Sequence, residues 1–153
     1  MTAPAPPPAF LVVEDGREYI DRFTRLLGAS FRFARAGSAA EATAALAVGG
    51  VAGVLLDLDF RRTPGEALID EAGRAGLPPH ERRRVAAVQG ILIAHALRRY
   101  APAIRMLLFA DLGDAEQIAF LEGELAPLRV VASSVGLNEI GGLLARIATG
   151  GAP

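Results

Sequence analysis

Residues 51–65, with the sequence VAGVLLDLDFRRTPG, contain a run of valine and leucine that ends abruptly at Asp57. A short apolar run bounded by turn residues is typical of a strand buried on both faces, as in the parallel sheets of α/β proteins. Open α/β sheets bind ligands beyond the carboxyl ends of their strands, so Asp57 and Asp59 are candidates for a cation or phosphoryl site. The alternative is that Asp57 only caps the turn that follows.

The overall composition limits the classes of function. A chain of 153 residues is long enough for one domain with a sizeable core. Its net charge of −1 provides no basic field for nucleic acid, and the absence of cysteine excludes disulfides, thiolate metal sites and a cysteine nucleophile. The longest uncharged stretch, 42–56, is shorter than the roughly 18 to 20 apolar residues of a membrane-spanning helix. We therefore expect a soluble, cytoplasmic protein.

The rest of the chain alternates short apolar runs with segments of helical spacing. Strands that alternate with helices form parallel sheets, so the pattern predicts a doubly wound α/β fold with five strands. A weaker pattern over residues 61–88 indicates an insertion between the third and fourth strands. Besides the opening stretch, the predicted strands are 10–13, 31–35, 104–110 and 128–132, and the predicted helices are 17–27, 38–48, 79–100, 115–125 and 137–148, with a short helical piece at 66–74.

The two ends of the chain differ from its middle. Residues 1–9 are rich in proline and are predicted to be a disordered arm, residues 10–149 are predicted to be a single domain, and residues 150–153 a tail. Within the domain, five aromatic side chains are predicted to lie in the core, namely Phe10, Phe23, Phe31, Phe33 and Phe120.

Acidic residues also follow the first predicted strand. Glu14 and Asp15 come directly after FLVV, and neighbouring strands of a doubly wound sheet would bring them to the same rim as Asp57. Three crowded carboxylates repel one another, and a hard cation such as Mg²⁺ relieves this repulsion while accepting oxygen ligands. Glu14, Asp15 and Asp57 are therefore the predicted Mg²⁺ ligands.

These motifs resemble the receiver domain of bacterial response regulators. The resemblance covers residues 10–149 apart from the insertion, and lies in VVED at 12–15, AGSAAEATAAL at 36–46 and LLDLD at 55–59. It implies a flavodoxin-like sheet in the order 2-1-3-4-5. In that family the paired acids hold Mg²⁺ and the aspartate of the third strand accepts a phosphoryl group from a histidine kinase, which here implies Asp57 as the phosphoacceptor.

The sequence departs from the family at the positions that respond to phosphorylation. Receivers carry Thr or Ser at the end of the fourth strand, where this chain has Phe109, and Lys after the fifth strand, where it has Ser133. The chain contains no lysine. Arg61 or Arg62 could substitute for the missing charge, although surface arginines beside a loop are more often solvated. The resemblance is therefore to a degenerate pseudo-receiver, a non-enzymatic protein-interaction module, with a working phosphoacceptor receiver as the alternative.

Two other families offer rival interpretations of the same acids. The Toprim domain of primases and nucleases carries a Glu and a D-x-D motif that bind Mg²⁺, which Glu14, Asp57 and Asp59 resemble. Against it, no glycine follows Glu14 directly, and the later strand–helix units fit a receiver better. The haloacid-dehalogenase-like phosphatases carry a similar motif, but on their first strand and with a downstream lysine.

Partner contacts are predicted on two surfaces. The run Arg82, Arg83 and Arg84 is either a solvated helix face or a contact with a protein partner, and the insertion that contains it is the expected source of partner specificity. Receivers often pair through their fourth helix, fifth strand and fifth helix, which implies a homodimer as a further possibility. The candidate residues for such a dimer interface are apolar, and their periodicity fits a place in the core equally well. They are Ile118, Leu121, Leu144 and Ile147.

Overall fold

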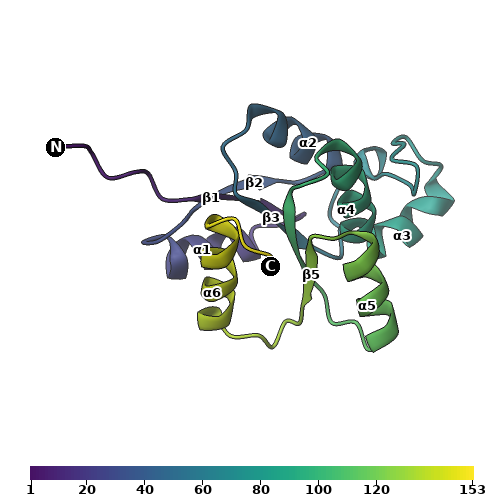
Figure 1. The fold of residues 1–153 in the computed structure, drawn as a ribbon. Coiled ribbons are helices and arrows are strands. Elements are labelled where there is room, and N and C mark those ends of the chain that lie inside the picture. Colours follow the sequence, from purple (N-terminus) through teal and green to yellow (C-terminus); the bar gives the residue numbers. More distant parts are fainter.

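The opening stretch forms the central strand of the sheet. A computed structural model describes residues 1–153 and contains one parallel sheet of five strands in the order β2-β1-β3-β4-β5 (Figure 1). The buried run Val54–Leu56 lies in β3, which pairs with β1 on one side and β4 on the other. The strands are β1 (Ala9–Val13), β2 (Arg32–Ala36), β3 (Gly53–Asp57), β4 (Arg105–Phe109) and β5 (Leu128–Val131). The predicted fold class and strand order are confirmed.

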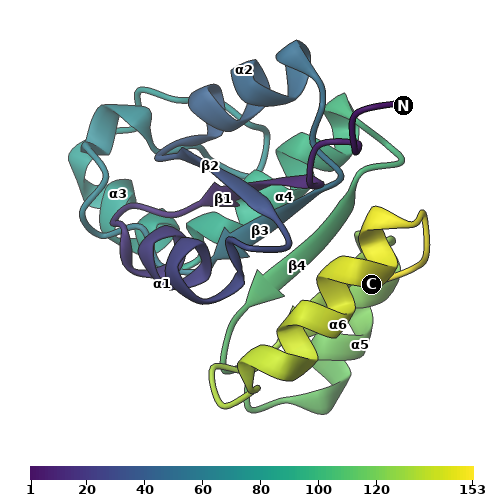
Figure 2. The same ribbon diagram turned by 90° about the vertical axis from the view of Figure 1, so that its left-hand side faces the viewer.

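Helices cover both faces of the sheet. They are α1 (Glu18–Leu27), α2 (Ala39–Val48), α3 (Pro79–Ala87), α4 (Gln89–Tyr100), α5 (Ala115–Glu124) and α6 (Leu137–Ala148), with a 3₁₀ turn, η1 (Gly65–Ala67). Successive strand side chains point to opposite faces, so Phe10 packs in a cluster with α1 and α6, whereas Leu11 packs in a cluster with residues of α2, α3, α4 and α5. Figure 2 shows α6 running alongside β4. None of these helices is both long enough and apolar enough to cross a membrane.

The predicted helix 79–100 is instead two helices that meet at Val88. The backbone leaves helical geometry there, with φ −126° and ψ 17°, and Gly90 then packs against the end of β3. A Cβ on Gly90 would lie 1.9 Å from the Asp57 carbonyl oxygen, and the Gly90 N–H donates to the Leu58 carbonyl at 2.9 Å. Helical periodicity does not reveal this break because it results from a tertiary contact with the strand.

The predicted helical piece 66–74 is also wrong beyond its first residues. Only Gly65–Ala67 is helical, as a 3₁₀ turn. The following loop is held by Asp70, whose Oδ1 accepts from the backbone N–H groups of Ala72 and Arg74, and it turns at Gly73 with φ 79°. A short aspartate that bonds the nearby backbone favours a turn over a helix.

Some core predictions require correction. Phe120 is 64% exposed, because Leu121 and Leu125 form the buried face of α5 and the neighbouring position points away from it. Phe10, Phe23 and Phe31 are buried as predicted, and Phe33 is partly buried. Of the apolar residues considered for a homodimer, Leu121, Leu144 and Ile147 are buried and Ile118 is partly exposed, so the core interpretation holds for the first three.

The arm contacts the sheet where it enters it. Ala9 already belongs to β1, one residue before the predicted start, and the Pro8 carbonyl accepts from the Arg32 N–H at 2.8 Å. Residues 1–8 contain no helix or strand. The disorder predicted for the arm, and the division into arm, domain and tail, stay predictions.

Candidate functional site

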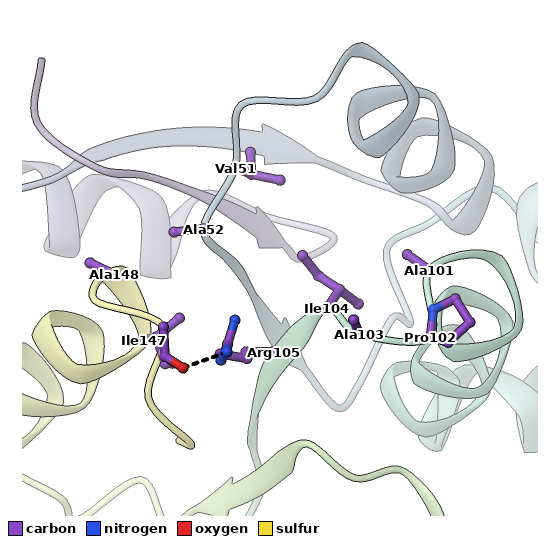
Figure 3. Close-up of a pocket in the computed structure, with 10 residues that line it drawn as sticks. Val51, Ala52, Ala101, Pro102, Ala103, Ile104, Arg105, Ile147 and Ala148 are labelled. Carbon is purple, nitrogen blue, oxygen red and sulfur yellow. Dashed lines mark hydrogen bonds between the residues drawn. The ribbon is translucent and has the colours of Figure 1, made fainter.

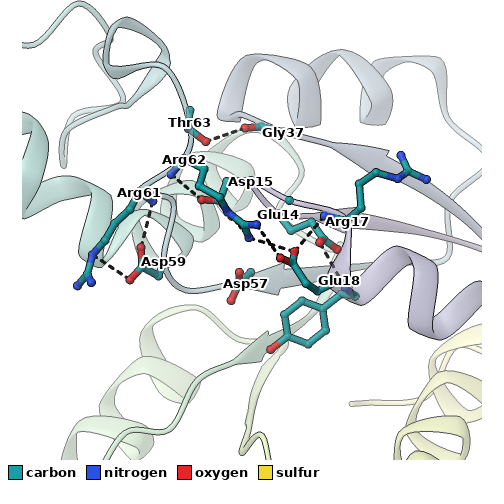
Figure 4. Close-up of polar contacts among 12 residues, drawn as sticks. Glu14, Asp15, Arg17, Glu18, Gly37, Asp57, Asp59, Arg61, Arg62 and Thr63 are labelled. Carbon is teal, nitrogen blue, oxygen red and sulfur yellow. Dashed lines mark hydrogen bonds and ion pairs between the residues drawn. The ribbon is translucent and has the colours of Figure 1, made fainter.

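The acidic residues predicted from the sequence gather at one edge of the sheet. Because β1 and β3 are parallel neighbours, their carboxyl ends bring Glu14, Asp15 and Asp57 together, and the loop after β3 adds Asp59 and Arg62 (Figure 4). The register also places Phe109, at the end of β4, directly beside Asp57. The strand order therefore brings the three acids named from the family resemblance to one edge, and their roles stay predictions.

Glu14 is used to start α1. Its side chain is buried, with Oε2 accepting from the Ile20 N–H at 2.9 Å and Oε1 from the Tyr19 N–H at 3.2 Å. Burial raises the pKa of Glu14, while the two backbone hydrogen bonds oppose that shift. Each carboxylate oxygen thus satisfies an N–H group that a helix start leaves without a partner.

Arg62 reaches into the acidic cluster and pairs with Asp15. Its backbone N–H donates to Asp15 Oδ2 at 2.8 Å, and its Nη2 lies 3.0 Å from Asp15 Oδ1. The same guanidinium contacts Glu18 through Nη1, at 2.6 Å from Oε1, which lowers the pKa of Glu18 to about 2 and raises that of Arg62. The Asp15 side chain is only 3% exposed, so its charge is compensated mainly by this one arginine.

Asp57 has no cationic partner and accepts one hydrogen bond from the protein. Its Oδ1 accepts from the Leu58 N–H at 2.8 Å, and no ion pair involves it. Burial, assisted by the charges of Asp15, Glu14 and Asp59, raises the pKa of Asp57 to about 6. Asp57 is therefore mostly ionised at neutral pH and keeps a free oxygen, Oδ2.

Asp59 takes part in a local turn rather than in the cluster. Its Oδ1 accepts from the Arg61 N–H at 3.0 Å, and its Oδ2 pairs with Arg61 Nε at 3.1 Å. The Toprim interpretation needs Asp59 to converge with Glu14 and Asp57, but Asp59 is paired with Arg61 and Glu14 is bonded to α1.

The carboxylates do not fit a bound Mg²⁺ ion in this arrangement. No three His, Cys, Asp or Glu side chains are placed to hold a metal ion. Glu14 accepts from the α1 backbone and Asp15 from Arg62, so Asp57 alone has a free oxygen. A hard cation needs several oxygen ligands converging on one point, and a guanidinium already lies against one of the three acids predicted to bind it.

Aromatic rings occupy the place expected for the switch hydroxyl. Phe109 is buried, with its ring centroid 5.1 Å from that of Tyr19 and 5.7 Å from that of Phe23. Burial, with the charges of Asp57 and Asp111, raises the pKa of Tyr19 to about 12. Sequence reasoning missed Tyr19, although its i,i+4 spacing from Phe23 on an amphipathic helix could have identified it.

The position expected to hold a lysine is occupied by a serine that faces another acid. Ser133 donates from its N–H to Asp111 Oδ1 at 2.8 Å and from its hydroxyl to Asp111 Oδ2 at 2.5 Å. These two hydrogen bonds lower the pKa of Asp111. They tie the loop after β4 to the loop after β5, so Ser133 supplies neither a positive charge nor a contact with Asp57.

The histidines and the arginine run lie outside the acidic cluster. His80 is exposed at the start of α3, and burial on α4 lowers the pKa of His95. The arginines of α3 face the insertion instead. A hollow of about 510 Å³ lies at the opposite ends of the strands, between the start of β4 and the end of α6; it is mostly apolar and contains no acid (Figure 3).

Comparisons with known proteins show which fold this is. No protein-family model and no curated protein matches the sequence. A response regulator receiver domain from Clostridium thermocellum matches with a TM-score of 0.65 at 12% identity, over 93% of this chain and 94% of that chain. A sensor protein from Polaromonas sp. JS666 matches with a TM-score of 0.64 at 19% identity, over 95% and 98% of the two chains. An adenylate cyclase from Rhodopirellula baltica matches with a TM-score of 0.66 at 14% identity, over 94% and 89%. The chain therefore has the receiver-domain fold.

Proposed function

Starting from the receiver fold, we propose that this chain is a protein-interaction module of a bacterial signalling system, without enzymatic turnover, whose state is not set by phosphorylation of Asp57. The observation that carries the proposal is the contact of Arg62 with Asp15 and Glu18, with Arg62 Nη2 3.0 Å from Asp15 Oδ1. A receiver needs Mg²⁺ beside its phosphoacceptor, and here a side chain of the protein supplies the positive charge instead.

The tethered guanidinium differs from a metal ion in what it can do. Mg²⁺ binds acid and phosphoryl oxygens together and neutralises charge on the transferring group. Arg62 is held by Asp15 and Glu18, and no hydrogen bond or ion pair connects it to Asp57. Arg62 therefore compensates the charges of Asp15 and Glu18 but offers no positive charge to a phosphoryl group that approaches Asp57.

The switch positions support the same proposal. A phosphorylated receiver needs a hydroxyl and a cation near the new phosphate to convert phosphorylation into a surface change. Phe109 has no hydrogen-bond donor and is fixed by Tyr19 and Phe23, and the Ser133 hydroxyl already donates to Asp111. Neither side chain offers a free donor to a phosphoryl group on Asp57, so we expect the interaction surface to be the same before and after exposure to phosphodonors.

A working phosphoacceptor is the second candidate function. One observation favours it, namely that Asp57 has a free oxygen and a pKa of about 6, which leaves an ionised nucleophile at neutral pH. Phosphorylation would then require Mg²⁺ to displace Arg62 from Asp15.

A mass measurement separates the two candidates. The protein is incubated with acetyl phosphate and Mg²⁺ at neutral pH, and its intact mass is recorded beside that of Asp57→Asn and of an unrelated receiver domain with a complete site. We expect the unrelated domain to gain a phosphoryl group and this protein to gain none. A stable adduct on the wild type that Asp57→Asn lacks would establish the second candidate instead.

A further inference from the structure

The insertion forms a second polar pocket, outside the acidic cluster. A hollow of about 430 Å³ lies between the loop after β3 and the first turns of α3. Three arginines line it, Arg61 from the loop and Arg82 and Arg83 from α3. Thr63, also on its wall, donates from its hydroxyl to the Gly37 carbonyl at 3.2 Å, which ties this wall to the turn before α2. The remaining lining residues are Gly65, Leu68 and Ala86.

Arg82 is held in place with its charged end free. Its Nε donates to the Leu77 carbonyl at 2.9 Å, and no hydrogen bond or ion pair involves Nη1 or Nη2. The side chain lies directly on Gly65, where a Cβ would be 2.5 Å from Arg82 Cδ and 2.9 Å from Nη1. The guanidinium fork is therefore pre-organised, so binding an anion costs little further side-chain entropy.

The charges of this pocket are not balanced by the protein. Arg61 pairs with Asp59 at 3.1 Å, but neither Arg82 nor Arg83 has an ion-pair partner. Arg84, the next residue along α3, pairs with Glu71 at 3.1 Å and does not line the pocket. Two guanidiniums without ion-pair partners on the wall of one hollow match a compact group that carries two negative charges.

The surroundings select among anions. A phosphate monoester carries a charge of about −1.5 to −2 at pH 7 and accepts bidentate hydrogen bonds from a guanidinium. A nucleic-acid backbone would extend past the pocket, and the net charge of −1 gives the chain no wider basic field to hold it. The pocket therefore suits a single phosphate group better than a polyanion.

We propose that the insertion binds a phosphate monoester, with Arg82 as the fixed fork and Arg83 as the second charge. This divides the arginine run, which the sequence left as either a solvated helix face or a partner contact, because Arg84 is paired elsewhere. The proposal rests on the insertion alone and holds whether or not Asp57 accepts a phosphoryl group.

The test is a titration of the full chain, followed by amide NMR spectra. The probes are inorganic phosphate, a short phosphoserine peptide, AMP and a glutamate peptide of equal length, all at constant ionic strength. We expect inorganic phosphate to cause saturable chemical-shift changes confined to residues 61–86. We expect the same changes with the phosphoserine peptide, with AMP or with both, and the probe that binds identifies the source of the phosphate group. Binding of the glutamate peptide as tight as that of every phosphorylated probe, or no saturable shift with any probe, would overturn the proposal.

Variants locate the site. Arg82→Gln and Arg83→Gln should each weaken phosphate binding about tenfold or more, whereas Arg84→Gln should leave it unchanged. Gly65→Ala keeps every charge but displaces the Arg82 side chain, so it should weaken binding even though the fold is retained by circular dichroism. Asp57→Asn should bind phosphate like the wild type, which keeps this result separate from the test of phosphorylation. Equal weakening by Arg84→Gln would show non-specific screening and would refute the site.

Discussion

Arg62 Nη2 lies 3.0 Å from Asp15 Oδ1, and this ion pair joins the loop after β3 to the end of β1. The Asp15 side chain is almost fully buried, whereas Arg62 is largely exposed, so the arginine covers Asp15 from the solvent side. The pair has two consequences. It supplies a positive charge to Asp15 where a receiver would use a metal ion, and it fixes the start of the insertion relative to the sheet.

Replacing Arg62 should create a binding site for a divalent cation. In Arg62→Gln the buried Asp15 loses its counter-charge, and Mg²⁺ can then approach Asp15 and Asp57 from the side that the guanidinium covered. Isothermal titration calorimetry should detect Mg²⁺ binding in Arg62→Gln and none in the wild type at millimolar concentrations. Arg61→Gln, which breaks only the surface pair with Asp59, is the matched control and should behave like the wild type. Mg²⁺ binding of equal strength in all three proteins would contradict the role given to Arg62.

Asp57 should make the protein less stable as the pH rises. Its pKa of about 6 in the folded state exceeds the usual 3.8, so between these values the folded state holds more protons than the unfolded state. The free energy of unfolding therefore falls between about pH 4 and pH 6 and is then constant for this group. The fall is at most about 3 kcal/mol, and smaller because solvent screens the partly exposed carboxyl. Urea denaturation of Asp57→Asn should show greater stability than the wild type at pH 7 and nearly equal stability at pH 4. A constant difference between the two proteins across this range would refute the assigned shift.

Replacing Phe109 with the threonine that receivers carry at this position should destabilise the protein. Phe109→Thr removes the ring packed on Tyr19 and Phe23 and leaves a cavity with an unpaired hydroxyl, which should cost about 3 to 5 kcal/mol in chemical denaturation. Phe120→Thr makes the same chemical change on an exposed face of α5 and should cost less than about 1 kcal/mol. Similar losses for both variants would mean that Phe109 is not packed as described.

Gly90 should tolerate no side chain. In Gly90→Ala the Cβ would lie 1.9 Å from the Asp57 carbonyl oxygen, so α4 must move away from the end of β3, at a cost of about 2 kcal/mol or more. Gly123 lies inside α5, and a Cβ there meets nothing within 4 Å. Gly123→Ala should therefore stabilise the protein by up to about 1 kcal/mol, through helix propensity. Thermal denaturation of both variants measures the two effects. A Gly90→Ala variant that is more stable than the wild type would show that α4 does not press against β3.

Much of the fold could be predicted because its signals are local. Buried parallel strands are continuous apolar runs, and β3 and β4 lie within one or two residues of their predicted limits. The helix 137–148 was predicted with the same ends that α6 has, since glycine precedes it and its apolar residues recur at helical spacing. The break at Val88 was not predicted because it depends on the contact of Gly90 with the distant end of β3. The irregular loop after Ala67 was also missed, although the Asp70 turn that holds it is a local feature.

The sequence by itself determined which chemical groups are available: acids after two strands, a phenylalanine and a serine at the switch positions, and arginine as the only strong cation. Only the tertiary structure decided how these groups are paired. Glu14 bonds to the α1 backbone, Asp15 to Arg62 and Asp111 to Ser133, which leaves Asp57 alone. The physical reason is that pairing depends on distance and burial. Arg62 lies 47 positions from Asp15 in the chain, and only the folded sheet and insertion bring the two into contact.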